Sequence, residues 1–367
     1  MGTRGIPARY GGFETFAEQL ATRLVARGHA VTVYGRRGFL EPKSPDQSCR
    51  GVTVRITPTF RHKYLETPVH ALTSFLDLFR RSFDVVLLCN AANSPCAFLV
   101  KLRKLPLLIN VDGIERNRTK WNLLGKAWYL LGEKASVLFA TRVIADAKVI
   151  ADYYEERYGI TTEVIAYGAE AVMRPAGATL EKFGLTSRKY LLYVSRLEPE
   201  NNALGVIEAY KKTDMRMPLV VVGDAPYADS YKESLRSAAQ GVTVIFTGFQ
   251  FGEAYQEFQS NCMAYIQATE VGGTHPALIE SMAYGNCILA NGTPENIEVL
   301  GDSGIIYSKN NFDELGGKLQ HLMSDNGQVE VSRAKAKDRA EKLYLWDAIT
   351  DKYEKLLLDV ARHDVAQ

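Results

Sequence analysis

Two kinds of segment alternate along most of the chain. Short runs of β-branched and apolar residues are followed by longer stretches in which apolar residues recur at helical spacing. This alternation is typical of parallel sheets whose strands are joined by crossover helices. One series of strands is predicted at 30–34, 52–56, 84–89, 107–111, 142–145 and 163–166, and a second at 190–195, 219–222, 242–247, 264–267 and 287–290. The pattern therefore predicts an α/β protein with two Rossmann-like domains.

The stretch between the two series contains Pro175, Gly177 and Gly184 and has weak periodicity, which is typical of a linker. We expect a first domain over 1–170, a linker over 171–188 and a second domain over 189–342, with a cleft opening at the linker. Residues 343–367 carry apolar positions at helical spacing and predict a C-terminal helix.

The beginning of the chain predicts a helix over 13–27, because Phe13, Phe16, Leu20 and Leu24 form one apolar stripe. A glycine-rich loop precedes this helix, and in a wound α/β domain such a loop follows a buried strand. No strand pattern precedes the loop. We expect either that the given start lies downstream of a first strand or that the domain tolerates its loss.

Composition narrows the class of protein. The chain has 367 residues, of which 46% are hydrophobic and 23% charged, and these values exclude disordered, collagen-like and coiled-coil classes. No run approaches the roughly 18 apolar residues of a membrane span, and residues 1–5 lack the apolar core of a secretory signal, so we expect a cytoplasmic protein. The five cysteines include no Cys-x-x-Cys pair, which argues against a disulfide framework and a zinc site.

The charges that sum to the net value of +2 are unevenly distributed along the chain. Residues 1–170 contain 24 Lys and Arg against 16 Asp and Glu, and the remainder contains 20 against 26. A basic half attracts anionic partners or forms a solvated face without a partner. The basic segments are 101–104 and 116–134, and the second places Trp121, Leu124, Trp128 and Leu131 near one another on a helix flanked by Lys120, Lys126 and Lys134. Such a helix fits either an anionic membrane surface or the protein core.

The segment 270–280 follows a short strand and runs into a helix with a proline in its first turn. Gly272, Gly273 and Thr274 are predicted where free backbone N–H groups and the positive end of the helix dipole converge, an arrangement that binds phosphate. Glu280 would repel a phosphate and instead suits the vicinal hydroxyls of a ribose. An ordinary helix start with an exposed glutamate explains the same spacing.

The segment 193–202 leaves the first strand of the second sheet. Arg196 lies just beyond the carboxyl end of that strand, where open α/β sheets bind ligands. Its guanidinium suits a diphosphate, because two N–H groups can bind it side by side while the charge neutralises a leaving group. The alternative is a surface arginine paired with Glu198 or Glu200.

These two segments together resemble the family 4 glycosyltransferases, retaining enzymes of the GT-B architecture. In that family a Gly-Arg-Leu-x-Pro-Glu-Lys-Asn stretch opens the second domain, where this chain has Ser195-Arg-Leu-Glu-Pro-Glu-Asn-Asn202, and two glutamates separated by seven residues follow later. The resemblance covers nearly the whole chain, including Gly223-Asp224, Gly248-Phe249 and Asn296-Ile-Glu298. It implies two domains facing across a cleft and a C-terminal helix that returns to the first domain.

Three stretches resemble a narrower subgroup, which contains rhamnosyltransferases of cell-surface polysaccharide assembly. They are 2–16, with the sequence GTRGIPARYGGFETF, 110–115 together with Lys120-Trp121, and 271–276. Three matching stretches in the same order are far more specific than any one of them.

Two positions depart from the family pattern. The family's first glutamate would fall at Gly272, and its usual lysine at Asn201. A lost positive charge weakens the diphosphate site unless helix dipoles or another base compensate. The subgroup shares both changes, which implies altered donor handling. Glu270 either replaces the missing carboxylate or is an exposed residue without a role.

The resemblance implies roles for residues of both domains. Arg196, Asp112 and Glu270 are the implied catalytic residues, and Asp112 lies where the wider family often has a histidine, although it could also cap a helix. Gly11 and Gly12 either let the backbone approach the sugar or diphosphate or merely turn the chain. The implied donor-binding residues are Gly11, Gly12, Gly223, Arg196, Asn201, Phe249, Gly272, Gly273, Thr274, His275 and Glu280, with His275 as a helix-start residue rather than a base.

The implied reaction transfers a hexose or deoxyhexose from a UDP- or dTDP-linked sugar to a saccharide or polyprenyl-linked saccharide, with retained configuration. No cofactor and no metal are expected, and the sequence contains no Asp-x-Asp triplet of the kind that metal-dependent transferases usually carry. Expected partners are the nucleotide sugar, the acceptor and the inner face of an anionic membrane, and not nucleic acid.

Two other functions remain open from the sequence. The substitutions at Asn201 and Gly272 are also compatible with a non-catalytic protein that binds sugar nucleotides. An NADP-dependent oxidoreductase is suggested by Gly2-x-x-Gly5-x-x-Ala8 with Arg36-Arg37 after the next strand. The spacing of those glycines does not match the dinucleotide-binding fingerprint.

Overall fold

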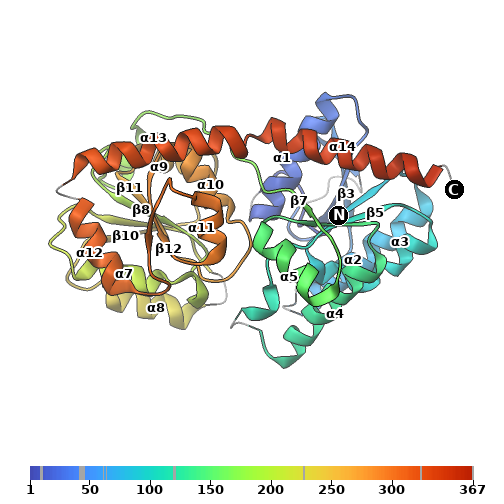
Figure 1. The fold of residues 1–367 in the computed structure, drawn as a ribbon, viewed down its shortest axis with the longest axis horizontal. Coiled ribbons are helices and arrows are strands. Elements are labelled where there is room, and N and C mark those ends of the chain that lie inside the picture. Colours follow the sequence, from blue (N-terminus) through green and yellow to red (C-terminus); the bar gives the residue numbers. More distant parts are fainter. Residues whose placement is uncertain are drawn as a thin grey trace. The chain divides into compact units, whose positions relative to one another are not determined.

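The computed structural model describes residues 1–8, 11–40, 46–60, 62, 64–118, 121–225, 228–322 and 325–365. The chain divides into two compact units, the first made of 1–168 with 346–367 and the second of 169–345 (Figure 1). Each unit contains a parallel sheet with helices packed on it, so the fold is the α/β type that the alternation of segments predicts. Residues 171–188, which were expected to form a linker, belong to the second unit and include helix α6 (Ala178–Lys182).

The strands of the first unit form two sheets. The first sheet has the order β1-β3-β2, and the second is a parallel sheet with the order β4-β5-β6-β7. Their bounds are β1 (Thr32–Arg36), β2 (Asp46–Cys49), β3 (Val52–Thr57), β4 (Val86–Cys89), β5 (Leu107–Asn110), β6 (Arg142–Ala145) and β7 (Glu163–Val164). Residues 1–4 contact both sheets, because Cys89 N donates to Met1 O at 3.0 Å and Arg36 N donates to Arg4 O at 3.1 Å.

The helices of the first unit include the C-terminal one. They are α1 (Gly12–Ala26), α2 (Glu66–Asp77), α3 (Phe98–Leu102), α4 (Leu123–Phe139), α5 (Lys148–Tyr158) and α14 (Trp346–Val365), with the 3-10 turns η1 (Leu78–Arg80), η2 (Ala91–Cys96) and η3 (Glu115–Asn117). Helix α14 packs on α1: the rings of Phe16 and Tyr353 lie 5.1 Å apart, and Arg27 Nη1 donates to Glu354 Oε2 at 2.6 Å. The end of the chain therefore completes the core of the unit that its beginning forms.

The second unit has one parallel sheet of order β10-β9-β8-β11-β12-β13. Its strands are β8 (Leu191–Val194), β9 (Leu219–Val222), β10 (Val244–Gly248), β11 (Ala264–Gln267), β12 (Cys287–Asn291) and β13 (Ile305–Tyr307). Its helices besides α6 are α7 (Ala203–Lys211), α8 (Asp229–Ala238), α9 (Gly252–Asn261), α10 (Pro276–Ala283), α11 (Pro294–Leu300), α12 (Phe312–Leu322) and α13 (Asn326–Leu343), with the turn η4 (Pro199–Asn201).

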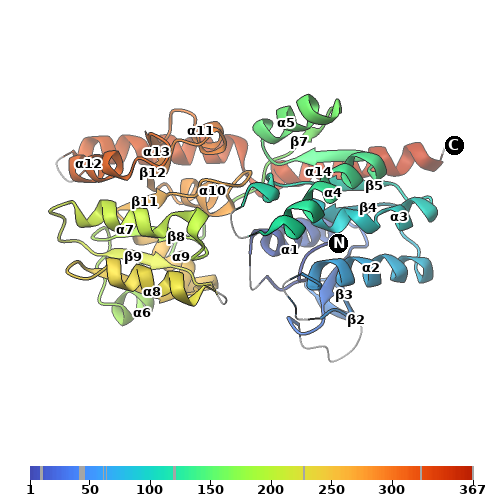
Figure 2. The same ribbon diagram turned by 90° about the horizontal axis from the view of Figure 1, so that it is seen from below.

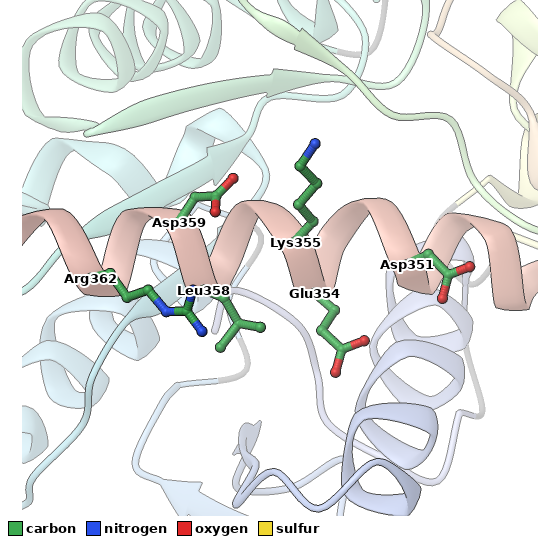
Figure 3. Close-up of a pocket in the computed structure, with 6 residues that line it drawn as sticks. All are labelled: Asp351, Glu354, Lys355, Leu358, Asp359 and Arg362. Carbon is green, nitrogen blue, oxygen red and sulfur yellow. The ribbon is translucent and has the colours of Figure 1, made fainter.

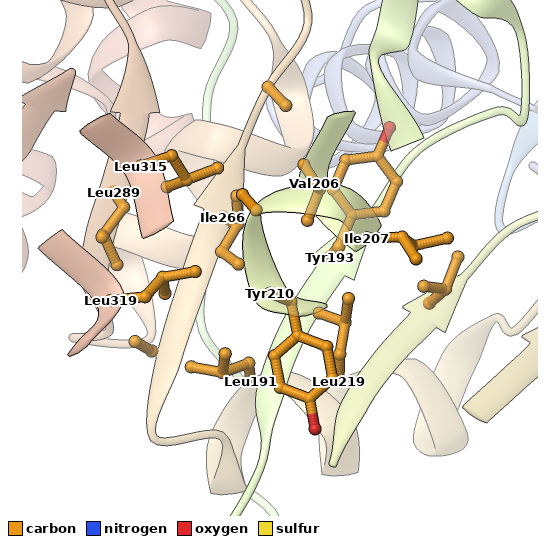
Figure 4. Close-up of a cluster of buried hydrophobic side chains, with 14 of the residues drawn as sticks. Leu191, Tyr193, Val206, Ile207, Tyr210, Leu219, Ile266, Leu289, Leu315 and Leu319 are labelled. Carbon is orange, nitrogen blue, oxygen red and sulfur yellow. The ribbon is translucent and has the colours of Figure 1, made fainter. Parts of the chain in front are cut away.

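Apolar side chains from the sheet and from the helices α7, α8, α12 and α13 form the core of the second unit. Leu191, Leu219 and Ile266 of the sheet lie against Val206 and Tyr210 of α7 and against leucines of α12 (Figure 4). Both faces of every central strand are buried, which explains why these strands read as continuous apolar runs in the sequence. No helix in the described part of the chain has both the length and the apolar character to cross a membrane.

Candidate functional site

The carboxyl edge of the second unit's sheet brings two predicted segments into contact. Strands β8 and β11 are neighbours and parallel, so the loops that follow them leave the sheet side by side. Glu270 N donates to Glu200 O at 3.1 Å, and Asn202 Nδ2 donates to Ala268 O at 3.0 Å. The arginine segment and the glycine segment therefore form one continuous surface at this edge.

Arg196 lies in the loop after β8 and keeps an exposed guanidinium. Its side chain is 37% exposed, and the nearest carboxylate oxygen, of Glu198, lies 3.8 Å from Arg196 Nη2. That separation is close to the limit for an ion pair, so the pair is weak in solvent. The guanidinium can therefore turn toward a bound anion at little cost.

Asn201 stabilises the same loop from inside. Its side chain is buried and donates from Nδ2 to Arg196 O at 2.7 Å, while Tyr193 Oη donates to Asn201 O at 2.6 Å. The amide that replaces the family's lysine is thus occupied by the backbone of the arginine segment. Asn201 acts on Arg196 by fixing the loop that carries it.

The glycine segment leads into α10, as the sequence predicts. His275 is the N-cap residue and Pro276 the first residue of the helix. Gly272 has φ +156°, and a Cβ at this position would lie 2.6 Å from His275 Cε1, so only glycine lets the loop pass that ring. Gly273 and Thr274 are buried beside it. The helix start thus combines small residues with the positive end of a helix dipole.

Glu280 lies in the second turn of α10 and is held by a tyrosine that the sequence analysis did not identify. Tyr255 Oη of α9 donates to Glu280 Oε2 at 2.6 Å, and Gln259 Nε2 donates to Tyr255 Oη at 2.9 Å. Burial raises the pKa of the Glu280 carboxyl, and the hydrogen bond from Tyr255 opposes that rise. The hydrogen bond therefore favours the ionised form that would accept hydrogen bonds from a diol.

Glu270 is half-buried and has a defined partner. Asn310 Nδ2 donates to Glu270 Oε2, and Asn310 N donates to Asn291 Oδ1 at 2.9 Å. Asn291 Nδ2 in turn donates to Ala268 O at 3.1 Å, at the start of the same loop. Asn291 is the last residue of β12 and Asn310 follows β13, and they fix the direction in which the Glu270 loop leaves the sheet.

Gly223 and Phe249 lie at the same edge, after β9 and β10. Gly223 has φ +138°, and a Cβ there would lie 1.8 Å from Ser195 O, so the loop before Arg196 packs directly on this glycine. Phe249 stacks on the half-exposed Phe251, with ring centroids 5.9 Å apart. Gly223 N also donates to Gly248 O at 2.9 Å, which ties the two loops together.

Asp112 lies at the carboxyl edge of the first unit's parallel sheet, after β5. It has φ +54°, and its N–H donates to Asn110 Oδ1 at 3.1 Å. Tyr167 Oη donates to Asp112 Oδ1 at 3.5 Å, and Asp146, which follows β6, forms a side-chain hydrogen bond with it. Burial and the nearby Glu115 charge raise the pKa of the Asp112 carboxyl to about 6. Asp146 and Tyr167 were not identified from the sequence.

Gly11 and Gly12 begin α1, as the sequence predicts. Gly11 is the N-cap residue, with an extended backbone, and Gly12 is the first residue of the helix. Ahead of them, Arg4 N donates to Glu14 Oε1 at 2.8 Å and Ala8 N donates to Glu18 Oε2 at 2.6 Å. Carboxylates of α1 therefore occupy backbone N–H groups of the preceding loop. Arg9, Tyr10 and Lys120 of the predicted motifs lie outside the described residues.

A shallow hollow of about 320 Å³ runs along α14, lined by charged side chains that include Asp351, Lys355 and Arg362 (Figure 3). Its Glu354 accepts from Arg27 Nη1 at 2.6 Å and lies 2.6 Å from His29 Nε2. These contacts join α14 to the segment that follows α1, so both oxygens of this carboxylate already have a partner. Among the described residues, no group of three His, Cys, Asp or Glu side chains is arranged to hold a metal ion.

Two family models match most of the chain. Residues 10–170 match the model described as Glycosyltransferase Family 4, and residues 179–343 match the model described as Glycosyl transferases group 1. The two models meet near the boundary that separates the two units.

Curated relatives are distant in sequence. An O-antigen chain mannosyltransferase B of Escherichia coli is 24% identical over 52% of this chain and 52% of its own length, and an alpha-monoglucosyldiacylglycerol synthase of Streptococcus pneumoniae is 26% identical over 48% and 42%. The chain thus spans about half the length of these two relatives. A GDP-mannose-dependent alpha-(1-6)-phosphatidylinositol monomannoside mannosyltransferase of Mycobacterium tuberculosis is 22% identical over 99% of this chain and 98% of its own.

Solved structures match over almost the whole chain. Sucrose-phosphate synthase from Thermosynechococcus elongatus superposes with a TM-score of 0.80 and 17% identity, covering 96% of each chain. Anabaena HepE in complex with UDP-glucose superposes with a TM-score of 0.78 and 14% identity, covering 97% of this chain and 98% of its own. At these identities the likeness concerns the fold.

Proposed function

We propose, from the premise that the chain belongs to glycosyltransferase family 4 and has the GT-B fold, that it transfers a hexose or deoxyhexose from a UDP- or dTDP-linked sugar. As a member of this family it is a glycosyltransferase that acts on nucleotide sugars. The transfer retains the anomeric configuration and needs no metal ion. The acceptor is a saccharide or lipid-linked saccharide of surface polysaccharide synthesis.

One observation carries this proposal: Arg196 and the glycine segment before α10 belong to two loops joined by hydrogen bonds at one sheet edge. Breaking the bond between sugar and diphosphate develops negative charge on the leaving group. An arginine and a helix start directed at that charge lower the barrier, because their dipoles are already in place. Gly272 and Gly273 allow the diphosphate to approach the backbone.

The nucleoside is assigned to the neighbouring part of the same edge. Glu280 accepts the two ribose hydroxyls, while the hydrogen bond from Tyr255 orients its carboxylate and favours the ionised form. Gly223 and Phe249 contribute to the same donor site from the loops after β9 and β10. On the first unit, we assign Asp112, Gly11 and Gly12 to contacts with the transferred sugar.

The names of the relatives support an acceptor that carries carbohydrate or lipid. One is named for an O-antigen chain, one for a glucosyldiacylglycerol and one for a phosphatidylinositol mannoside. We therefore propose a polyprenyl-linked or other lipid-linked saccharide, bound while the enzyme is at the cytoplasmic face of an anionic membrane through its basic first unit.

A non-catalytic protein that binds sugar nucleotides is the second candidate. It is favoured by one observation, the uncharged residues Gly272 and Asn201 at two positions that are charged in the wider family. In the structure Asn201 is engaged with the backbone of Arg196 and supplies no charge to a ligand.

Binding and turnover measured on one preparation separate the two functions. In a thermal-shift panel of UDP-, dTDP- and GDP-sugars, the true donor raises the melting temperature, because it binds only the folded state. With that donor and a lipid-linked saccharide acceptor, an enzyme forms the glycosylated product with the donor's configuration. Binding without release of nucleoside diphosphate would favour the second candidate, and no binding of any sugar nucleotide would contradict both.

A further inference from the structure

The first unit exposes apolar side chains along α2 and the turn that follows it. Leu65, Leu72, Leu76 and Phe79 are between 41% and 51% exposed. Their spacings of seven, four and three residues place them on one side of the helix. The buried residues of α2 are His70, Ala71, Ser74, Phe75 and Asp77. Helix α2 therefore packs on the protein with one side and still presents large apolar side chains to solvent with another.

Helix α4 shows the same pattern more strongly. Leu123, Leu124, Leu131 and Leu138 are 85%, 78%, 50% and 65% exposed, and helical spacing places them on one side. The other side faces the protein, where Ser136 Oγ donates to Ser94 Oγ at 2.8 Å. A surface helix ordinarily turns its polar side to water.

The two tryptophans of this segment differ from the four leucines. Trp121 precedes α4, which begins at Leu123. Trp128 is half-buried, and its Nε1 donates to Ala92 O at 3.0 Å.

The short helix α3 connects these two surfaces. Its Phe98 and Leu102 are 43% and 68% exposed, and the Phe98 ring lies 6.4 Å from that of Phe139 at the end of α4. On its other side, Arg103 Nη2 donates to Arg81 O at 3.1 Å, next to Phe79. Helices α2, α3 and α4 lie together on one side of the first unit (Figure 2). We call the ten residues Leu65, Leu72, Leu76, Phe79, Phe98, Leu102, Leu123, Leu124, Leu131 and Leu138 the apolar face.

The charges around the apolar face have one sign. Exposed cations lie on η1, on α3 or just after it, and on α4, the same segments that carry the apolar side chains, and they are Arg80, Lys101, Lys104, Lys126 and Lys134. None of them forms an ion pair with a residue that the structure describes. Among the described residues from 64 to 139, Asp84 is the one exposed carboxylate. A hollow of about 430 Å³ beside α4 is lined by Arg116, Lys126, Ala127 and Leu130.

We propose that the apolar face binds the surface of an anionic lipid bilayer, with its leucines and phenylalanines in the acyl boundary and its lysines at the headgroup phosphates. In such a surface the charged headgroups lie above the acyl chains, so a patch of apolar side chains surrounded by cations fits both layers. A neutral protein partner would cover the leucines and leave five cations without counter-charges. The inference deepens the proposed function, since it names the membrane-binding residues, but the binding itself requires no sugar nucleotide.

Vesicle co-sedimentation of the full chain tests this inference. We expect binding to vesicles of phosphatidylcholine with 30% phosphatidylglycerol, and at least tenfold weaker binding to phosphatidylcholine alone or in 0.5 M salt. The double variant Leu76→Glu, Leu102→Glu and the double variant Leu123→Glu, Leu131→Glu should each weaken binding about tenfold or more. Lys126→Gln with Lys134→Gln should weaken it only on anionic vesicles.

Matched variants elsewhere separate the face from a general effect of charge. Val331→Glu on α13 is exposed to 58% and should bind vesicles as the wild type does. All substituted positions are exposed, so unchanged melting temperatures are expected and report intact folding. Wild-type binding by the two leucine variants would overturn the inference. So would a concentration-dependent dimer that those variants abolish while the wild type ignores vesicles, because a second copy would then cover the face.

The same preparations keep this inference distinct from the proposed function. A thermal-shift response to UDP-sugars is measured beside vesicle binding. Vesicle binding without any nucleotide response contradicts the proposed donor site and leaves the membrane surface standing. A nucleotide response without vesicle binding supports the proposed donor site and contradicts the membrane-binding inference.

Discussion

Arg196 is the residue on which the proposed leaving-group chemistry depends. We expect Arg196→Ala to lower kcat by about 10²–10³-fold, because an electrostatic contact made to the developing charge is lost. Since the side chain is 37% exposed and only weakly paired, the melting temperature should change little. Arg196→Lys keeps the charge without the planar fork and should recover part of the rate. Steady-state kinetics with the identified donor check this, and full activity in the alanine variant would remove Arg196 from the mechanism.

Tyr255 offers a test of how Glu280 is kept ionised. The variant Tyr255→Phe removes the hydrogen bond that opposes the burial of Glu280, so the pKa of that carboxyl rises further. We expect nucleoside diphosphate binding to weaken at a higher pH than in the wild type as the solution is acidified, because the protonated carboxyl accepts the ribose hydroxyls less well. Isothermal titration over a series of pH values measures the effect.

Tyr210→Phe is the matched control for that experiment. Tyr210 Oη donates to Met217 O at 2.9 Å and has no contact with a carboxylate. Loss of the Tyr210 hydroxyl should change the free energy of unfolding, while the pH dependence of nucleoside diphosphate binding stays as in the wild type. An identical pH profile in Tyr255→Phe would show that Tyr255 does not act through the ionisation of Glu280.

The stability of the protein should depend on pH through the Asp112 carboxyl, and the direction of this dependence can be predicted. Its pKa of about 6 in the folded state lies above the value of 3.8 expected in the unfolded chain. The folded state therefore binds the proton more tightly, and stability falls as pH rises from about 4 to about 6. We expect Asp112→Asn to remove this slope and to stabilise the protein at pH 7.5 by roughly 1–2 kcal/mol, while sugar transfer declines.

Thermal unfolding of Asp112→Asn at pH 4.5 and pH 7.5 makes that measurement. Asp84→Asn, at an exposed carboxylate, serves as the control and should show no such gain. If Asp112→Asn is as stable as the wild type at both values of pH, the surroundings of the Asp112 carboxyl do not raise its pKa.

Residues of the candidate site could be predicted only where local sequence carries the signal. Gly272, Arg196 and Glu280 stand at fixed distances from a strand end or a helix start, so spacing alone places them at the sheet edge. Tyr255 contacts Glu280 across 25 residues of chain, and Asp146 meets Asp112 because β5 and β6 pair. Such partners depend on tertiary packing, which neither periodicity nor motif spacing encodes.

At the scale of elements, the order of the strands in the sheet determines which loops lie next to one another at its carboxyl edge. Gly223 limits how these loops can pack, because it directly follows β9 at the point where the loop after β8 passes over it. Gly223→Ala would place a methyl group 1.8 Å from Ser195 O at a φ of +138°. The clash is with a backbone oxygen, which cannot move aside as the end of a side chain can. We therefore expect the free energy of unfolding to fall by about 3 kcal/mol or more.

Gly317→Ala is the contrasting variant, to be followed in the same denaturant titrations. A Cβ at Gly317, within α12, would meet nothing within 4 Å. Alanine there should stabilise the protein by about 0.5–1 kcal/mol through helix propensity. A small effect at Gly223 would mean that the loop carrying Arg196 is not locked onto β9.

All the central strands and four of the six edge strands of the described residues could be predicted from sequence, and the two edge strands β2 and β13 could not. Strands β6, β9 and β11 have the bounds that their apolar runs predict. Strand β2 was missed because Asp46–Cys49 is polar and only half-buried at a sheet edge, and β13 because it spans three residues, Ile305–Tyr307. Burial on both faces produces the pattern that sequence reading detects.

At the scale of the whole molecule, the two units differ in the surfaces they present. The second unit carries the arginine and glycine loops of the candidate donor site, and the first carries the apolar face and most of the excess positive charge. The charge imbalance was visible in the sequence, and it predicted a basic first half. Which leucines face outward was not visible, because core and surface stripes have the same helical spacing.

The chain passes from the first unit to the second and back at neighbouring points. Ala169 N donates to Tyr344 O at 2.7 Å, and a Cβ on Gly168 would lie 2.5 Å from the Trp346 ring. In genetic terms, residues 169–345 are a cassette whose two ends meet. Under the proposed function, exchange of this cassette at the two junctions changes the donor and keeps the acceptor, so recombination can separate the two choices.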